Sequence, residues 1–317
     1  MGSSPRTALA IGRAIQDGAL DPVTLARECL DRASASEAVF IALTPERALA
    51  EAEAAARRQK LGTPLGPLDG VPLAWKDLFD IRGTLTTAGS RILAHTPAEE
   101  DATAVRHATG AGMVCIGKTN LSELAYSGLG LNPHYGTPHH APADSVARVP
   151  GGSSSGSAIA VAQGIVPAAI GTDTAGSLRV PAAFNGLVSY RPSRARHDRQ
   201  GVTPLAPSLD TIGAMATTVQ DCLAIDDTLR GRRVAPRVPA APECTLIILD
   251  TGCLEDERLE PAVRRNLETR AEGLARAGFH VIRRRVASVG ATLELIEHYG
   301  WLGAAEAYTE YLSLIHI

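Results

Sequence analysis

Residues 151–158 are Gly-Gly-Ser-Ser-Ser-Gly-Ser-Ala, and residues 171–179 are Gly-Thr-Asp-Thr-Ala-Gly-Ser-Leu-Arg. Each stretch alone is typical of a flexible loop, because runs of glycine and serine do not build a packed core. A phosphate-binding loop is disfavoured, since residues 151–157 lack the Gly-Lys-Ser/Thr ending that such a loop requires. The two stretches become informative together with a third.

The third stretch is residues 70–77, Gly-Val-Pro-Leu-Ala-Trp-Lys-Asp. Its apolar residues 71–75 predict a short buried strand that ends at Lys76. A lysine at a strand end, a serine among glycines and a second serine after a glycine-rich turn are the parts of a Ser-Ser-Lys hydrolase. The sequence therefore predicts nucleophilic catalysis by serine.

Apolar periodicity predicts helices and strands that alternate along the chain. The predicted helices are residues 8–33, 45–60, 101–110, 120–127, 158–163 and 257–277. The predicted strands are residues 71–75, 113–116, 166–170, 245–250 and 280–282, with a tight turn at 171–176 and loops at 62–70 and 131–152. Short apolar strands alternating with helices indicate an α/β fold with a largely buried sheet, and one domain is the simpler interpretation.

The composition is typical of a soluble globular protein, with 45% hydrophobic residues, 21% charged residues and a net charge of −3. The mixed charges argue against a nucleic-acid partner. Because no run of about 18 apolar residues occurs, no membrane span is expected, and residues 1–6 do not open a signal peptide. Five scattered cysteines without a Cys-x-x-Cys pair favour free thiols, so the expected location is cytoplasmic.

Taken in order along the chain, the three stretches make this sequence resemble the amidase signature family. The resemblance extends to Gly117-Lys118-Thr119-Asn120 and Ser208-Leu209-Asp210-Thr211. It implies a single amidase-signature domain over residues 1–311, with a mixed central β-sheet covered by helices on both faces. The expected parts of that domain are an N-terminal helical segment, residues 8–60, and a catalytic core, residues 65–215.

Matched residue by residue, the resemblance implies Ser177 as the acylated nucleophile, Ser153 as the bridging serine and Lys76 as the base. Ser153 lies 24 positions before Ser177, the separation in the family's motif. The family's bridging serine follows a cis peptide bond. A lysine accepts a proton only when it is uncharged, and burial after an apolar strand lowers its pKa from about 10.4.

The turn before the nucleophile has an expected task of its own. The expected donors to a developing oxyanion are the backbone N–H groups of Thr174, Ala175, Gly176 and Ser177. We expect Asp173, Arg179 and Ser154 to hold the reacting groups in position without taking part in the reaction themselves. For Arg179, a structural ion pair and a substrate contact both stay open.

Several positions depart from the family pattern. Ala175 stands where many relatives have glycine, and Ala-Gly-Ser before Arg-Val-Pro also resembles allophanate-type hydrolases. Val180 replaces a glutamine often found in A subunits of tRNA-dependent amidotransferases, which weakens that alternative. His139 and His140 stand where relatives often carry Asn-Pro. With His134 they suggest a metal site, but no carboxylate or cysteine completes a ligand set, so surface histidines are favoured and no metal is expected.

The chain ends earlier than family members usually do. Residues 312–317, Leu-Ser-Leu-Ile-His-Ile, also match one reading frame of a common sequencing adapter. We therefore expect a non-native tail on a C-terminally truncated member of the family. Missing strands would leave sheet edges and apolar surface exposed, which predicts poor solubility and little activity.

The expected function is hydrolysis of a small carboxamide or urea-type amide through an acyl-enzyme on Ser177, with no cofactor. The expected partner is a small-molecule amide, with no nucleic acid and no membrane, and a homodimer stays possible. Two alternatives stay open: the A subunit of a tRNA-dependent glutamine amidotransferase, and an inactive truncated fragment.

Overall fold

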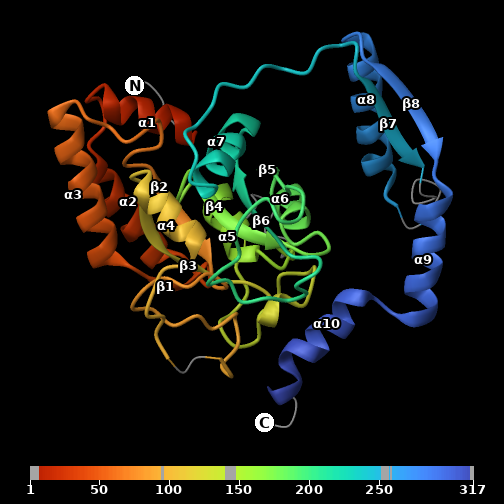
Figure 1. Cartoon of the computed structure of the whole chain (residues 1–317), viewed down its shortest axis with the longest axis horizontal. Coiled ribbons are helices and arrows are strands. Elements are labelled where there is room, and N and C mark those ends of the chain that lie inside the picture. The colour runs from red at the N-terminus through yellow and green to blue at the C-terminus, as the bar shows by residue number, and fades with distance from the viewer. Residues whose placement is uncertain (1–6, 94–95, 140–147, 251–256, 258, 315–317) are drawn as a thin grey trace. The chain divides into compact units, whose positions relative to one another are not determined.

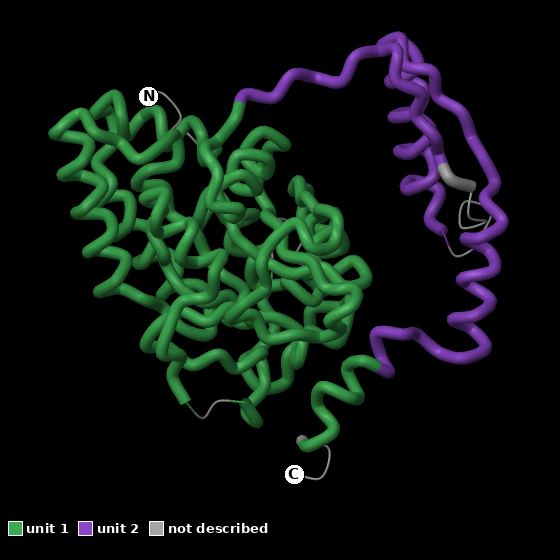
Figure 2. The backbone as a smooth tube through the Cα atoms, viewed as in Figure 1, with its two compact units in different colours: residues 1–235, 306–317 green, residues 236–305 purple. Residues whose placement is uncertain are grey.

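The computed structural model describes residues 7–93, 96–139, 148–250, 257 and 259–314. The chain divides into two compact units, coloured green and purple in Figure 2. Unit 1 consists of residues 1–235 and 306–317, and unit 2 consists of residues 236–305. The three predicted catalytic residues all lie in unit 1.

Unit 1 is built on a six-stranded sheet in the order β1-β3-β2-β4-β6-β5 (Figure 1). Its strands are β1 (Phe40–Leu43), β2 (Pro72–Lys76), β3 (Val114–Thr119), β4 (Ala168–Asp173), β5 (Val188–Ser189) and β6 (Thr211–Ala216). β2 pairs parallel with β3 and β4, whereas β1, β6 and β5 join antiparallel. Every residue of β2, β3, β4 and β6 is buried, as in sheets covered on both faces. The predicted α/β fold with a mixed central sheet is confirmed.

The helices of unit 1 are α1 (Ala8–Gln16), α2 (Pro22–Ala35), α3 (Pro45–Leu61), α4 (Thr103–Gly110), α5 (Ser155–Ala162), α6 (Arg179–Phe184), α7 (Val219–Leu229) and the part of α10 (Leu302–Tyr311) from Glu306 onward. The prediction of a single helix over residues 8–33 is wrong, because a turn between α1 and α2 interrupts the helix. Gly18 is left-handed there, with a φ of 72°, and the Asp21 side chain caps α2 by accepting the N–H of Thr24. Within the described residues, no helix is both long and apolar enough to cross a membrane.

The helix predicted over residues 120–127 is also wrong. Only a 3-10 turn, Glu123–Ala125, forms there. The amide of Asn120 instead donates to the backbone oxygens of Ala38 and Gly136, at 2.8 Å each. Contacts with distant parts of the chain thus override the local helical pattern.

Two crossover connections determine where the strand ends meet. The chain passes from β2 through α4 to β3, and then from β3 through α5 to β4, so the two steps run in opposite directions across the sheet. Because parallel crossovers are right-handed, α4 and α5 cover opposite faces. The carboxyl ends of β2, β3 and β4 meet where the direction reverses, which is where open α/β sheets bind ligands.

Unit 2 contains a parallel strand pair, β7 (Thr245–Asp250) and β8 (His280–Arg285), with the helices α8 (Pro261–Arg276) and α9 (Ala287–Tyr299). β7, α8 and β8 match the predicted strands 245–250 and 280–282 and the predicted helix 257–277, whereas α9 was not predicted. Apolar side chains on both helices are exposed, among them Val263, Leu267 and Leu295. Unit 2 is therefore a strand–helix–strand layer that leaves apolar surface uncovered.

Candidate active site

Lys76 is the last residue of β2, and its side chain is completely buried. Its Nζ donates hydrogen bonds to Ser153 Oγ at 2.6 Å and to Thr172 Oγ1 at 2.8 Å. Burial away from water lowers the pKa of Lys76 to about 7, although the charges of Asp210 and Asp173 act in the opposite direction. A large fraction of this amine is therefore uncharged near neutral pH, as a base requires.

A second buried lysine shows how unusual this environment is. Lys118 on β3 is equally buried, but its Nζ lies 2.6 Å from the carboxylate of Asp77. Within the described part of the chain, Lys76 has no carboxylate at ion-pair distance, and its two polar contacts are hydroxyl groups. Hydroxyl partners stabilise an ammonium less than a carboxylate does, so Lys76 is the lysine better suited to lose its proton.

Ser153 lies in the segment that leads into α5, and it is completely buried. The peptide bond between Gly152 and Ser153 is cis. A Cβ at Gly152 would lie 2.6 Å from Ser127 O and from Gly130 N, so only glycine allows this close approach of backbone. The carbonyl oxygen of Ser153 accepts the N–H of Ser122 at 3.1 Å. These contacts hold Ser153 against Lys76.

Ser177 follows β4 in a tight turn, and it is half-buried. Its carbonyl oxygen accepts the N–H of Ser154 at 3.2 Å, which joins the two serine-containing segments. Ser154 Oγ also donates to the backbone oxygen of Thr172 at 3.3 Å. Among the described residues, the Ser177 hydroxyl has no hydrogen bond to Ser153 Oγ. The structure thus brings Lys76 and Ser153 into direct contact and joins Ser177 to Ser154, the residue after Ser153, through the backbone.

The buried carboxylate of Asp173 organises the turn that carries Ser177. Its Oδ1 accepts the N–H of Gly176 at 2.8 Å. Arg179 pairs with both carboxylate oxygens, at 2.9 Å each, and Arg191 Nε lies 3.1 Å from Oδ1. Burial by itself raises the pKa of Asp173, but the hydrogen bonds and charge of Arg179 hold that pKa below its ordinary value. Arg179 therefore makes the structural ion pair, and its side chain stays 56% exposed.

The four predicted oxyanion donors differ in their contacts. Gly176, with a φ of 127°, already donates its N–H to Asp173. Thr174, Ala175 and Ser177 have backbone N–H groups with no acceptor among the residues that the structure covers. Three N–H groups at the nucleophile turn are therefore unoccupied.

Two residues with close contacts to the site were given no role by the sequence reasoning. Thr172 contacts Lys76, and Asp210 accepts the hydroxyl hydrogen of Thr174 at 2.5 Å. Thr172 lies two residues after Ile170, which pairs with Trp75 in the parallel register of β2 and β4, so its backbone is near the end of β2 where Lys76 lies. Asp210 belongs to residues 208–211, a stretch that carries the family resemblance, and this membership was a sequence signal that the residue matters. The sequence alone does not reveal which role Asp210 has.

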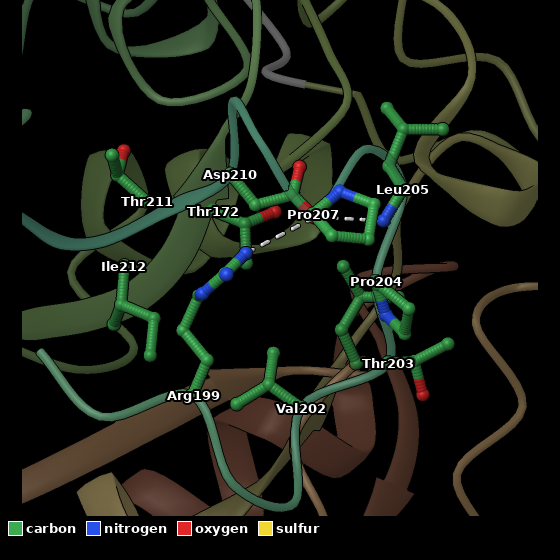
Figure 3. Close-up of a pocket in the computed structure, with 11 residues that line it drawn as sticks. Thr172, Arg199, Val202, Thr203, Pro204, Leu205, Pro207, Asp210, Thr211 and Ile212 are labelled. Carbon is green, nitrogen blue, oxygen red and sulfur yellow. Dashed lines mark hydrogen bonds and ion pairs between the residues drawn. The ribbon is translucent and has the colours of Figure 1, made fainter. Parts of the chain in front are cut away.

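A cavity of about 200 Å³ lies beside Thr172 (Figure 3). Its apolar lining consists of Leu78, Val202, Pro204, Leu205, Pro207 and Ile212. Arg199 and Asp210 are the charged residues of the lining. Figure 3 shows the guanidinium of Arg199 directed toward Asp210, with Nη1 3.9 Å from Oδ2. The cavity thus combines apolar walls with one cation and one anion.

The histidines considered as metal ligands do not gather in the described structure. His134 Nε2 lies 2.9 Å from Glu123 Oε1, and His139 contacts Gln163 through its backbone oxygen. His140 lies outside the described residues. No group of three or more His, Cys, Asp or Glu side chains within the described ranges is arranged to hold a metal ion.

Comparison with known sequences gives relatives that are longer than this chain. The A subunit of glutamyl-tRNA(Gln) amidotransferase from Cupriavidus necator is 46% identical over 209 residues, which cover 65% of this chain and 41% of that protein. Its counterpart from Chloroflexus aggregans is 45% identical over 232 residues, which cover 72% of this chain and 46% of that protein. The chain spans less than half the length of the curated relatives it matches.

Solved structures share the fold. A crystal structure of an amidase matches with a TM-score of 0.84 and 33% sequence identity, covering 97% of this chain and 69% of that one. The native peptide amidase from Stenotrophomonas maltophilia matches with a TM-score of 0.79 and 29% identity, covering 97% of this chain and 68% of that one. The family model named Amidase matches residues 24–316. This chain therefore belongs to the amidase signature family.

Proposed function

We propose that this chain carries the catalytic centre of an amide hydrolase that works through an acyl-enzyme on Ser177. The observation that carries the proposal is the buried amine of Lys76, which lies 2.6 Å from Ser153 Oγ and has a pKa of about 7. A serine hydroxyl is a poor nucleophile unless a base removes its proton during attack. Uncharged Lys76 supplies that base through Ser153.

In the first half-reaction, Ser177 Oγ bonds to the amide carbon while its proton passes to Ser153 Oγ, and the Ser153 proton passes to Lys76 Nζ. The C–N bond then breaks, and the departing amine or ammonia takes a proton from Ser153, which recovers one from Lys76. In the second half-reaction, water attacks the ester carbon and loses a proton along the same path. The acid leaves, and Ser177 regains its hydrogen.

The turn at Ser177 is suited to stabilise the tetrahedral oxyanion. The unoccupied N–H groups of Thr174, Ala175 and Ser177 support a set of three donors. We assign Gly176 the different task of anchoring the turn, because its N–H is bound by Asp173. Loss of one oxyanion donor typically costs about 2.7–4 kcal/mol of transition-state stabilisation.

The substrate that we propose is a small carboxamide or urea-type amide. We propose that it is hydrolysed without a cofactor, and that the protein can form a homodimer. Buried free thiols at Cys29, Cys115 and Cys222 support a reducing compartment, and we propose the cytoplasm. The peptide amidase among the solved relatives supports an amide substrate for this fold.

The second candidate is the A subunit of a tRNA-dependent amidotransferase, and the names of the curated relatives favour it. Val180, in place of the glutamine often found there, weighs against it. An activity assay distinguishes the two functions. We expect an amidotransferase A subunit to release ammonia from glutamine only together with its partner proteins, whereas a free-standing amidase hydrolyses small amides alone.

The decisive test is covalent labelling of the full chain by a fluorophosphonate probe, with the modified residue located by mass spectrometry. We expect one label, on Ser177, and none in Ser177→Ala or Lys76→Met. Ser193→Ala is the matched control, because Ser193 is exposed and lies outside the site. If the protein unfolds in a cooperative thermal transition but its Ser177 is not labelled, the result would instead support the alternative of an inactive truncated fragment.

A further inference from the structure

The cavity beside Thr172 contains a guanidinium whose donors are unused. Arg199 lines this cavity, and its side chain is 35% exposed. Its charged contact is Asp210 Oδ2 at 3.9 Å, which is too long for a hydrogen bond. In the described part of the chain, the guanidinium donates no hydrogen bond to any acceptor. An arginine has five N–H donors in a fixed fork, so this one is free to bind a ligand.

The nearby carboxylates are already occupied by other donors. Asp210 Oδ1 accepts the Thr174 hydroxyl at 2.5 Å, and Oδ2 accepts the N–H groups of Leu205 at 2.9 Å and Ala206 at 3.1 Å. Glu306, whose pKa responds to the charge of Arg199, accepts the backbone N–H of Ser208 at 2.9 Å. Both carboxylates therefore have hydrogen-bond donors other than Arg199.

The cavity touches the proposed catalytic machinery at two points. Thr172 lines the cavity and accepts a hydrogen bond from Lys76. Asp210 lines it too, and binds the hydroxyl of Thr174 in the nucleophile turn. A group in the cavity is therefore separated from the base and from the nucleophile turn by single side chains.

We propose that Arg199 determines specificity by binding the carboxylate of an anionic amide, such as the monoamide of a short dicarboxylic acid. The apolar walls formed by Val202, Leu205 and Ile212 would contact the carbon chain. Guanidinium and carboxylate groups match in geometry and form two parallel charge-assisted hydrogen bonds. This inference rests on the proposed hydrolase function for its catalytic meaning, but the binding itself does not require turnover.

The test measures binding in Ser177→Ala protein, where no chemistry interferes. Succinamate and succinamide are the probes, because they have nearly the same shape and differ by one negative charge. Calorimetric titration is expected to show succinamate binding at least about tenfold more tightly, and Arg199→Gln is expected to remove that preference. Arg199→Lys, which keeps the charge without the fork, should retain part of it.

Arg194→Gln is the matched control, since Arg194 is an exposed arginine of the same segment that is not in the cavity lining. It should keep the full preference, and thermal unfolding should show Arg199→Gln to be folded. Equal binding of the two probes, no detectable binding of succinamate, or an unchanged preference in Arg199→Gln would each overturn the inference. An Arg199-dependent preference in a chain whose Ser177 resists fluorophosphonate would support the site and contradict the hydrolase.

Discussion

Thr172 Oγ1 accepts a hydrogen bond from Lys76 Nζ at 2.8 Å, and the same amine contacts Ser153 Oγ at 2.6 Å. A hydroxyl acceptor favours the charged amine over the neutral one. Thr172→Val keeps the shape of the side chain and removes the acceptor. We expect the pKa of Lys76 to fall below about 7 and the free energy of unfolding to fall by about 1–3 kcal/mol.

The measurement is the rate of fluorophosphonate labelling as a function of pH, together with urea unfolding. Thr172→Ser is the control, because it keeps the hydroxyl and should leave the midpoint of the pH profile in place. A midpoint that does not move in Thr172→Val would mean that this hydrogen bond does not influence the base.

The unmodified chain should itself become more reactive as the pH rises through about 7. The base must be uncharged, and burial lowers the pKa of Lys76 to about 7 in the folded state from 10.5 in the unfolded state. Between these values the unfolded chain binds the additional proton, so the free energy of unfolding should rise with pH from about 7 to about 10.5. Lys76→Met should abolish labelling and remove this component of the stability profile. A labelling rate that is level between about pH 6 and about pH 9, a range that contains the expected midpoint, would exclude Lys76 as the titrating base.

The contact between Lys76 and Ser153 was implied by the resemblance to the amidase signature family, which both residues' short stretches carry in a distinctive order along the chain. Other parts of the sheet could not be predicted from the sequence. β1 (Phe40–Leu43) has only four residues, and β6 (Thr211–Ala216) contains glycine and alanine, which are weak strand formers. These strands form because their partners, β3 and β4, are already placed beside them.

The division into two units was also not foreseen, although the sequence carries a signal. Pro236, Pro239 and Pro242 lie in a segment without helix or strand between α7 and β7. Proline supplies no backbone N–H, so such a segment cannot continue a sheet or a helix. Thr172 and Asp210 were missed for a different reason: their importance depends on contacts across the sheet that only the fold reveals.

Asp173→Asn is expected to destabilise the nucleophile turn. The change removes a buried negative charge that pairs with Arg179 and Arg191 and accepts the N–H of Gly176. Loss of one partner from a buried ion pair typically costs about 3–5 kcal/mol. Because Arg179 is largely exposed and can return to water, we expect a loss of about 3 kcal/mol in the free energy of unfolding.

Urea unfolding checks this value, and Asp198→Asn, which changes an exposed aspartate, is the control and should lie within about 0.5 kcal/mol of the unmodified chain. Labelling of Ser177 in the folded Asp173→Asn protein should be slower, since the turn loses its anchor. Unchanged stability together with unchanged labelling would show that the arginine pairs do not hold the turn.

Lys118 and Asp77 form the buried ion pair at the ends of β3 and β2, with Nζ 2.6 Å from Oδ1. Lys118 also donates to the backbone oxygen of Leu85 at 2.6 Å and to Thr86 Oγ1 at 2.8 Å. Lys118→Met leaves the Asp77 carboxylate buried without its cation, so we expect a loss of about 3–5 kcal/mol in the free energy of unfolding. Lys60→Met, at an exposed position, is the control for removing a positive charge.

The double variant Lys118→Met with Asp77→Asn separates the ion pair from the rest of the packing. Removing the uncompensated charge should restore part of the stability, so the double variant should lose less free energy of unfolding than the two single changes added together. A coupling energy near zero would mean that the two charges do not stabilise each other, and that Lys118 acts only through its bonds to Leu85 and Thr86. In that case the end of β2, and with it Lys76, would be positioned by backbone pairing and by the hydrogen bonds that Asp77 accepts from Thr87, without a contribution from the ion pair.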